Sequence, residues 1–258
     1  MPRANTENTS AHRGTERILA IFEYLTDTEN VGKTLTEISQ HLDAPKSSLL
    51  PMLRTLAARG YLYYNSLTYQ YFIGYKLYEI GTKYVGEENI DDAIYQVLVN
   101  IANSNSVTVL LGELVAGDVL FLQKVDLFEK LRLYRAVGRR TPAYANALGK
   151  VLLSDKSLEE LKRLYPDGLT PITNKTITDF DVLAEELTHV HELGFARCNE
   201  EATPYVCSVA IPIMKAGHIA YGLEASMSIF EYNESKERQI LYSLYDAKSK
   251  IENFVKNH

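Results

Sequence analysis

The fold of this chain is decided by residues 34–64, which read TLTEISQHLDAPKSSLLPMLRTLAARGYLYY. Thr34 and Glu37 have the spacing of a capping box, in which each side chain accepts a hydrogen bond from the other residue's backbone amide at a helix start. A short turn then leads to Pro45, which suits the first turn of a new helix. Gly60 is typical of a helix end. The stretch therefore predicts two short helices joined by a tight turn.

The residues on either side complete a three-helix domain with a hairpin. Residues 15–25 place four apolar side chains on one helical face, those of Ile18, Leu19, Phe22 and Leu25. Aromatic-rich stretches at 61–64 and 69–73 flank a polar turn and predict two paired strands. Three short helices followed by a hairpin are typical of a winged helix-turn-helix.

From about residue 90 the pattern changes to alternating strands and helices. Strands are predicted at 107–114, 119–125, 131–137, 195–199, 206–214 and 219–228. Helices are predicted at 91–103, 144–153, 158–165, 178–193 and 234–255, and residues 138–142 read as a loop. Strands that follow one another as hairpins indicate an antiparallel α+β sheet, not a series of parallel strand–helix–strand units.

The domain organisation follows from these patterns. We expect a flexible polar arm at residues 1–12, a winged helix-turn-helix at 13–74, a linker helix at 75–88 and an α+β domain at 89–258. The chain has 258 residues, of which 46% are hydrophobic and 23% charged, as in ordinary globular proteins.

Composition also bears on location and charge. The apolar runs are too short to cross a bilayer, and the first residues lack the apolar segment of a secretory signal. Cys198 and Cys207 fit a reducing compartment, so we expect a cytoplasmic protein without membrane contact. Residues 1–74 hold seven basic and seven acidic residues, whereas the whole chain has a net charge of −6. Charge alone therefore gives only a faint indication of DNA binding.

The second helix of a helix-turn-helix enters the major groove of DNA, with its first residues near bases and phosphates. Lys46 at a helix start can receive a phosphate, and Arg54 has the reach for a phosphate or a guanine edge. A three-helix interaction module with a polar face is the alternative. The candidate DNA-binding residues are Thr34, Lys46, Ser47, Ser48, Leu50, Pro51, Arg54 and Thr55.

Several motifs, in this order along the chain, resemble the IclR family of bacterial transcriptional regulators. The resemblance spans about residues 13–255. The motifs that carry it are Ala44-Pro45-Lys46-Ser47-Ser48, Leu53-Arg54-Thr55-Leu56, Arg59-Gly60-Tyr61-Leu62, Val137-Gly138, Thr141-Pro142, Ala147-Leu148-Gly149-Lys150, Leu152-Leu153, Gly194-Phe195, Glu200-Glu201 and Val209-Ala210-Ile211-Pro212.

The chain departs from the family pattern at three places. Leu50 and Pro51 stand where the family usually has a polar aromatic residue or His and then Arg. Leu50 offers only apolar contact, for instance with a thymine methyl group. Pro51 lacks an amide hydrogen, so we expect it to kink the helix or to delay its start. The hairpin, normally charged, consists here mostly of tyrosines. These departures put the base contacts in doubt.

The resemblance implies that the second domain is GAF-like and binds one small effector. The residues it assigns to the effector pocket are Leu133, Thr141, Ala147, Leu148, Cys198, Val206, Ser208, Glu224 and Ser226. It also implies a homodimer or a tetramer, in which the effector favours one placement of the two DNA-binding heads. A repressor is expected more than an activator.

Glu224 and Ser226 lie two residues apart on a predicted strand, so they share one face. A buried carboxylate needs a partner, whereas the family often has small hydroxyl residues here and binds organic acids. We therefore expect a sugar, polyol or amine-bearing effector. The alternative is a surface glutamate on an edge strand.

No cofactor, metal site or catalytic group is predicted. His189 and His191 point to different faces of a predicted helix, and the glycines form no nucleotide-binding pattern. Two further hypotheses remain. One is an enzyme with an appended winged helix that uses Cys198, Glu200 or Glu224, and the other is a sensor scaffold that has lost DNA binding.

Overall fold

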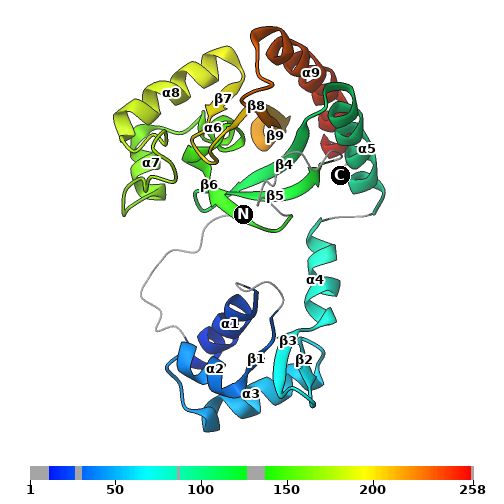
Figure 1. Ribbon diagram of the computed structural model, residues 1–258, viewed down its shortest axis with the longest axis vertical. Coiled ribbons are helices and arrows are strands. Elements are labelled where there is room, and N and C mark those ends of the chain that lie inside the picture. Colours follow the sequence, from blue (N-terminus) through cyan, green and yellow to red (C-terminus); the bar gives the residue numbers. More distant parts are fainter. Residues whose placement is uncertain (1–11, 27–30, 86–87, 127–136, 257–258) are drawn as a thin grey trace. The chain divides into compact units, whose positions relative to one another are not determined.

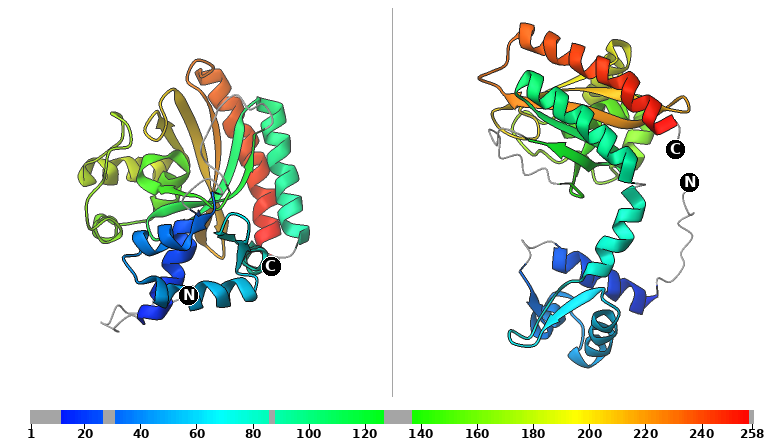
Figure 2. Two further views of the ribbon diagram at one scale, coloured as in Figure 1. Left: turned by 60° about the horizontal axis from the view of Figure 1, so that its bottom comes forward. Right: turned by 90° about the vertical axis from the view of Figure 1, so that its right-hand side faces the viewer.

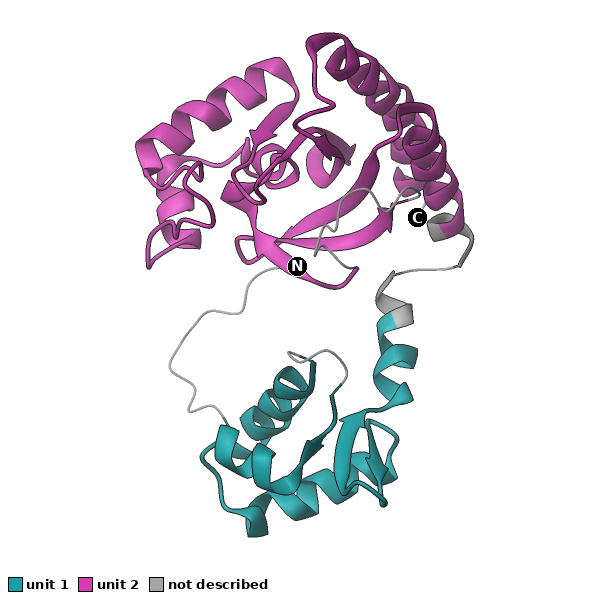
Figure 3. Ribbon diagram, viewed as in Figure 1, with its two compact units in different colours: residues 1–86 teal, residues 87–258 magenta. Residues whose placement is uncertain are grey.

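The computed structural model describes residues 12–26, 31–85, 88–126 and 137–256, with the side chains of residues 82–91 left out. The chain divides into two compact units, residues 1–86 and residues 87–258 (Figure 3). Each unit has its own hydrophobic core and is considered by itself.

The N-terminal unit is a winged helix-turn-helix, as the sequence predicts. Its helices are α1 (Arg13–Thr26), α2 (Leu35–His41) and α3 (Lys46–Ala58). The wing consists of β2 (Leu62–Asn65) and β3 (Gln70–Ile73), and β3 also pairs with a two-residue strand, β1 (Lys33–Thr34). With two residues, β1 is too short to show the alternation of apolar and polar side chains that predicts a strand, so it was not predicted. The core consists of Ile21, Leu25, Ile38, Leu49, Leu53, Leu62 and Tyr71.

Both predicted helix boundaries in the turn region are confirmed. The Thr34 hydroxyl accepts a hydrogen bond from the Glu37 amide at 3.3 Å, and Glu37 Oε2 accepts one from the Thr34 amide at 2.7 Å. Gly60 follows α3 with a φ of 78°, a conformation that glycine adopts without strain. A Cβ at Gly60 would lie 2.8 Å from the Tyr75 ring.

Pro51 does not delay the start of α3, contrary to one of the two expectations. The helix begins at Lys46, directly after Pro45, and Pro51 is its sixth residue. Proline has no amide hydrogen, so the Ser47 carbonyl one turn earlier loses that intrahelical donor. The unit ends with α4 (Tyr75–Val85), the linker helix.

The C-terminal unit is built on a six-stranded antiparallel sheet (Figure 1). The strand order is β6-β5-β4-β9-β8-β7. The strands are β4 (Thr108–Val115), β5 (Asp118–Val125), β6 (Arg140–Pro142), β7 (Ala196–Asn199), β8 (Val206–Lys215) and β9 (His218–Ser228). Antiparallel pairing throughout confirms the predicted α+β class.

Helices cover both faces of this sheet. α5 (Glu88–Asn105) and α9 (Glu234–Lys256) lie side by side on one face (Figure 2). On the opposite face the core is formed with α6 (Ala147–Leu153), α7 (Leu158–Leu164) and α8 (Phe180–Leu193). Among the described residues, no helix has the length and apolar character needed to cross a membrane.

Three details of the sequence prediction are corrected. The loop expected at 138–142 contains β6, which is only three residues long. The helix expected at 144–153 is divided into a 3-10 turn (Ala143–Ala145) and α6, because extended Asn146 caps α6 by accepting from the Gly149 amide. The helix expected at 178–193 begins at Phe180, and Asp179 caps it, since its carboxylate accepts hydrogen bonds from two amides of the first turn. The strand expected at 131–137 lies almost wholly outside the described residues.

Gly149 brings α6 close to the preceding turn. A Cβ at this position would lie 2.0 Å from the Ala143 carbonyl oxygen. No side chain larger than hydrogen fits there without moving backbone. α6 is thereby held over β9, where a Cβ at Gly222 would lie 2.8 Å from the Leu148 side chain.

Candidate DNA-binding face and candidate ligand face

The candidate DNA-binding residues of α3 lie mostly on its exposed side. Lys46, Ser47, Pro51, Arg54 and Thr55 are exposed. Ser48 and Leu50 are half-buried. The apolar side of the same helix buries Leu49 and Leu53 in the core. α3 therefore presents cations and hydroxyls to solvent, as a helix that enters a groove must.

Several of these groups already have a local partner. Lys46 Nζ donates to the Thr36 hydroxyl at 2.8 Å, and the Thr55 hydroxyl donates to the Pro51 carbonyl at 2.9 Å. The Ser48 hydroxyl donates to the Pro45 carbonyl at 2.8 Å. The side chains of Ser47 and Arg54 form no hydrogen bond with another described residue. The strongest free donor on this face is therefore the Arg54 guanidinium.

Thr34 differs from the other candidates because the helix cap uses its hydroxyl. Its Oγ1 donates to Glu37 Oε2 at 2.7 Å while accepting from the Glu37 amide. A phosphate at this position would have to displace the Glu37 carboxylate. Thr34 thus acts first as a structural residue of the turn.

The wing carries an exposed aromatic and apolar surface. Tyr63, Tyr69 and Leu67 are exposed, and Leu67 at the tip is 88% exposed. Asn65 Oδ1 accepts from the Leu67 amide at 2.9 Å and the Thr68 amide at 3.3 Å, which holds the turn. There is no basic residue between Gly60 and Gly74. Any contact of this wing with DNA relies on aromatic and hydroxyl groups instead of charge.

In the C-terminal unit, a row of buried polar side chains crosses four neighbouring strands. Thr108 of β4 lies opposite Ser226 of β9, Ser226 opposite Ser208 of β8, and Ser208 opposite Cys198 of β7. All four are buried. Paired residues on neighbouring strands share a face. This candidate ligand face, toward α6, therefore brings together three hydroxyls and a thiol.

Glu224 lies one step along β9 from this row, on the same face. Its side chain is 0% exposed, and β9 is a central strand, so the alternative of a surface glutamate on an edge strand is wrong. Oε2 accepts from the Leu148 amide of α6 at 2.9 Å, and Oε1 accepts from the Ser226 hydroxyl at 2.6 Å. The carboxylate thus finds the partners it needs within the domain.

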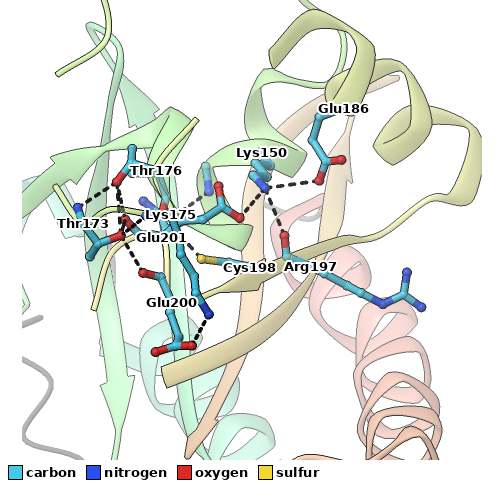
Figure 4. A network of polar contacts seen from close by, with 12 residues as sticks. Lys150, Thr173, Lys175, Thr176, Glu186, Arg197, Cys198, Glu200 and Glu201 are labelled. Carbon is cyan, nitrogen blue, oxygen red and sulfur yellow. Dashed lines mark hydrogen bonds and ion pairs between the residues drawn. The ribbon is translucent and has the colours of Figure 1, made fainter. Parts of the chain in front are cut away.

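The buried thiol of Cys198 adjoins an ion-pair network that the sequence did not indicate (Figure 4). Lys150 of α6 is 2% exposed, and its Nζ lies 2.7 Å from Glu201 Oε1 and 3.2 Å from Glu186 Oε1. Nζ also donates to the Arg197 carbonyl at 3.3 Å. Burial disfavours the charged ammonium, yet the neighbouring carboxylates outweigh this and raise the pKa of Lys150. Burial raises the pKa of Glu201.

Two threonines attach a surface loop to this network. The Thr173 hydroxyl donates to the Glu200 carbonyl at 2.8 Å, and the Thr176 hydroxyl donates to the Glu201 carbonyl at 2.7 Å (Figure 4). Lys175 forms an ion pair with Glu200. Glu200 therefore helps to fix this loop.

The remaining candidate pocket residues differ in position. Ala147, Leu148 and Val206 are buried in the core on this face. Thr141 of β6 is half-buried, and its hydroxyl accepts from Asn146 Nδ2 at 3.1 Å, so it supports the cap of α6. Leu133 lies outside the described residues.

Catalytic use of this face finds little support. Burial, together with the negative charge of Glu201, raises the pKa of the Cys198 thiol to about 11, so the thiol stays protonated near neutral pH. Its Sγ donates to the Ala145 carbonyl at 3.5 Å. Within the described ranges, no group of three or more His, Cys, Asp or Glu side chains is arranged to hold a metal ion.

Thr108, Lys150 and Glu201 also belong to this face, although the sequence did not predict them there. Thr108 lies directly opposite Ser226, and this neighbourhood follows only from the pairing of β4 with β9. Lys150 and Glu201 are 51 residues apart, and both belong to motifs that were noted without a structural role. The signal available was a lysine within an otherwise apolar helix, which requires a partner when buried.

A winged helix-turn-helix followed by an α+β domain with a polar interior face defines a class of protein, the two-domain DNA-binding regulators. Family models narrow this class. The model described as IclR helix-turn-helix domain matches residues 14–66, and the model described as Bacterial transcriptional regulator IclR C-terminal matches residues 82–253. The chain belongs to the IclR family of bacterial transcriptional regulators.

Known proteins agree with this assignment. The HTH-type transcriptional regulator KdgR of Escherichia coli is 27% identical, over 91% of this chain and 89% of the relative. The regulator BhcR of Paracoccus denitrificans is 32% identical, over 85% and 79% respectively. The fold matches an IclR homologue from Microbacterium hydrocarbonoxydans, solved with 4-hydroxybenzoate, at a TM-score of 0.82 and 18% identity, over 93% of this chain and 98% of the other.

Proposed function

We propose that this regulator binds an operator in double-stranded DNA through α3, and that a small molecule in the C-terminal domain alters this binding. The observation that carries the proposal is the exposure of Lys46, Ser47 and Arg54 on the second helix of the helix-turn-helix.

The contacts we propose follow from the chemistry of each side chain. Lys46 at the start of α3 binds a phosphate, and Ser47 and Ser48 donate to neighbouring backbone oxygens. Arg54 and Thr55 lie one to two turns later, where Arg54 meets a guanine edge or a phosphate. Leu50 and Pro51 supply apolar contact with thymine methyl groups, and Thr34 orients the turn.

The effector site we propose is the candidate ligand face beneath α6. Two buried hydroxyls there, those of Thr108 and Ser208, form no hydrogen bond with any described residue. The homologue solved with 4-hydroxybenzoate supports a small organic ligand in this kind of domain. The site residues are Leu133, Thr141, Ala147, Leu148, Cys198, Val206, Ser208, Glu224 and Ser226, and the ligand is a sugar, a polyol or an amine-bearing metabolite.

Coupling between the two functions requires more than one DNA-binding unit. We propose a homodimer, or a tetramer built from it, in the cytoplasm. The ligand shifts the population of its conformations toward those that fit the operator less well. α4 joins the domains in sequence, so the coupling passes through it. We propose repression, since occupancy of an operator suffices to block transcription, and we propose no catalytic activity.

Fluorescence anisotropy with the chain's own upstream DNA tests this function. We expect tight binding that weakens steeply as salt rises, because phosphate contacts release counterions. Lys46→Ala is expected to reduce affinity for every sequence and to lower the salt slope by about one. Lys162→Ala, an exposed lysine of α7, serves as the matched control. Absence of salt-sensitive binding to upstream DNA contradicts the regulator proposal.

A further inference from the structure

The directions of the hydrogen bonds at the candidate ligand face define what a ligand must bring. Ser226 donates its hydroxyl proton to Glu224 Oε1, so its oxygen offers only lone pairs to another partner. The Leu148 amide is occupied by Oε2 of the same carboxylate. Glu224 therefore uses up these two donors, and the Ser226 oxygen remains as an acceptor.

Further buried groups beside this pair have unused hydrogen-bonding capacity. The hydroxyls of Ser208 and Thr108 flank Ser226 in register and form no hydrogen bond with a described residue. Oε2 of Glu201 is also buried without a hydrogen-bond partner among the described residues. Buried polar groups without partners are rare in native proteins, and a bound molecule is one means of satisfying them.

Negative charge prevails around this face. The buried charged residues on this face are Glu224, Glu201 and Lys150, so carboxyl groups outnumber cations there. Burial raises the pKa of the Cys198 thiol, and the negative charges of Glu201 and Glu224 raise it further, so both carboxyl groups act at the same point of the face. A ligand carboxylate here would meet like charge in a poorly solvated environment, which is strongly unfavourable.

We propose that Glu224 is a built-in anion that sets the ligand class. The face takes a small, hydroxyl-rich molecule with no carboxylate or phosphate, a free sugar, an amino sugar or a polyol, whose hydroxyls donate to Ser226, Ser208 and Glu201. This inference rests on the proposed function, since it takes the face to be the effector site. It adds the permitted charge of the ligand, and a contact residue, Glu201, outside the set derived from the sequence.

Probes that share a carbon skeleton and differ in charge test the proposal. We would titrate the full chain with D-glucose, D-glucosamine and D-gluconate, with D-xylose, xylitol and D-xylonate, and with glycerol and glycerate. Calorimetry gives Kd and thermal unfolding gives the shift in Tm. Neutral or amino members are expected to bind at least about tenfold more tightly than the matching acids. Equal or tighter binding of the acids, or no binding by any member, overturns the proposal.

Glu224→Gln isolates the charge. The amide keeps the size of the side chain and can still accept from the Leu148 amide while its negative charge is gone. Affinity for the acids is expected to rise about tenfold or more relative to the neutral probes. Glu192→Gln makes the same charge change on an exposed residue of α8, and it is expected to alter neither the affinity for the acids nor that for the neutral probes. Unchanged discrimination in E224Q contradicts the assigned role.

The wild-type comparison needs no variant, so it decides the proposal even if E224Q fails to fold. Operator binding without ligand is measured separately. If the chain binds its operator but does not prefer the sugars to the acids, this inference is wrong and the proposed regulator function stands. Absent operator binding removes the regulator function, whatever the ligand preference.

Discussion

The two candidate faces differ in where their polar groups find partners. On α3, Ser47 and Arg54 are exposed without a hydrogen bond to another described residue, and Lys46 bonds only an exposed threonine. On the sheet, Glu224 and Lys150 are buried, and each is bonded within its own domain. Substitutions on the first face are therefore expected to change binding with little effect on folding, whereas substitutions on the second are expected to change stability first.

The largest effect on stability is expected from Lys150→Ala, which tests the difference between the two faces. Removal of one partner from a buried ion pair leaves an uncompensated charge, so we expect the free energy of unfolding of the C-terminal unit to fall by about 3–5 kcal/mol. Urea denaturation measures it, with Lys162→Ala as the exposed control. The double variant Lys150→Met/Glu201→Leu is expected to regain much of the loss, because no buried charge is left unpaired and Glu186 is partly exposed to solvent. A loss below about 1 kcal/mol in K150A, the upper range for an exposed pair, breaks the contrast.

Gly149→Ala tests whether α6 is fixed against the preceding turn. The new Cβ would approach the Ala143 carbonyl oxygen to 2.0 Å, so backbone must move, and we expect a loss of about 3 kcal/mol in unfolding free energy. Gly81→Ala in α4 meets nothing within 4 Å and is expected to stabilise its helix by about 0.5–1 kcal/mol. Equal effects of the two variants would mean that α6 has room to shift.

Arg54→Ala sharpens the other side of the comparison. We expect operator affinity to fall by about 1–3 kcal/mol, with little change in the Tm of the N-terminal unit, since the Arg54 side chain forms no hydrogen bond or ion pair with a described residue. If Arg54 meets a guanine, the loss concentrates on one position of the operator, whereas a phosphate contact weakens all sequences alike. Arg163→Ala on α7 is the control in the anisotropy assay. A drop in Tm equal to that of K150A would contradict the division into two kinds of face.

Thr34→Ala should have the smallest effect, about 1 kcal/mol of unfolding free energy of the N-terminal unit. The backbone amide and hydroxyl of Thr34 lower the pKa of Glu37 from its ordinary value of 4.5. A lowered folded-state pKa contributes stability above 4.5 that disappears as pH falls through the lowered value. Urea titrations at neutral pH and below that range should show a flatter pH dependence in T34A. An identical pH profile would exclude the capping box as its source.

The local patterns of the N-terminal unit were predictable because each depends on near neighbours in sequence. The Thr34–Glu37 box, Gly60 and the wing all follow from spacing within a few residues, and all were found. Pro51 shows the limit of such rules. The sequence predicted that Pro51 kinks the helix or delays its start, but α3 begins at Lys46 and continues through Pro51, with Leu49 and Leu53 buried on its core side.

The candidate ligand face was harder to predict than the helix-turn-helix, because its residues come together only through the register of paired strands. Glu224 and Ser226 share a face by simple alternation, which the sequence revealed, whereas Thr108 joins them from more than a hundred residues away through pairing alone. The sequence also indicated that a buried Glu224 needs a partner. It did not indicate that the partner is the backbone of α6, since that contact depends on how closely Gly149 and Gly222 let the helix approach.

The placement of the two cysteines determines how the protein responds to oxidants. Cys198 and Cys207 are buried in cores on opposite faces of one sheet, and burial raises the pKa of each thiol to about 11. Peroxide reacts with the thiolate, and a disulfide requires two sulfurs side by side. We therefore expect peroxide to leave both cysteines, and the packing on either side of the sheet, unchanged.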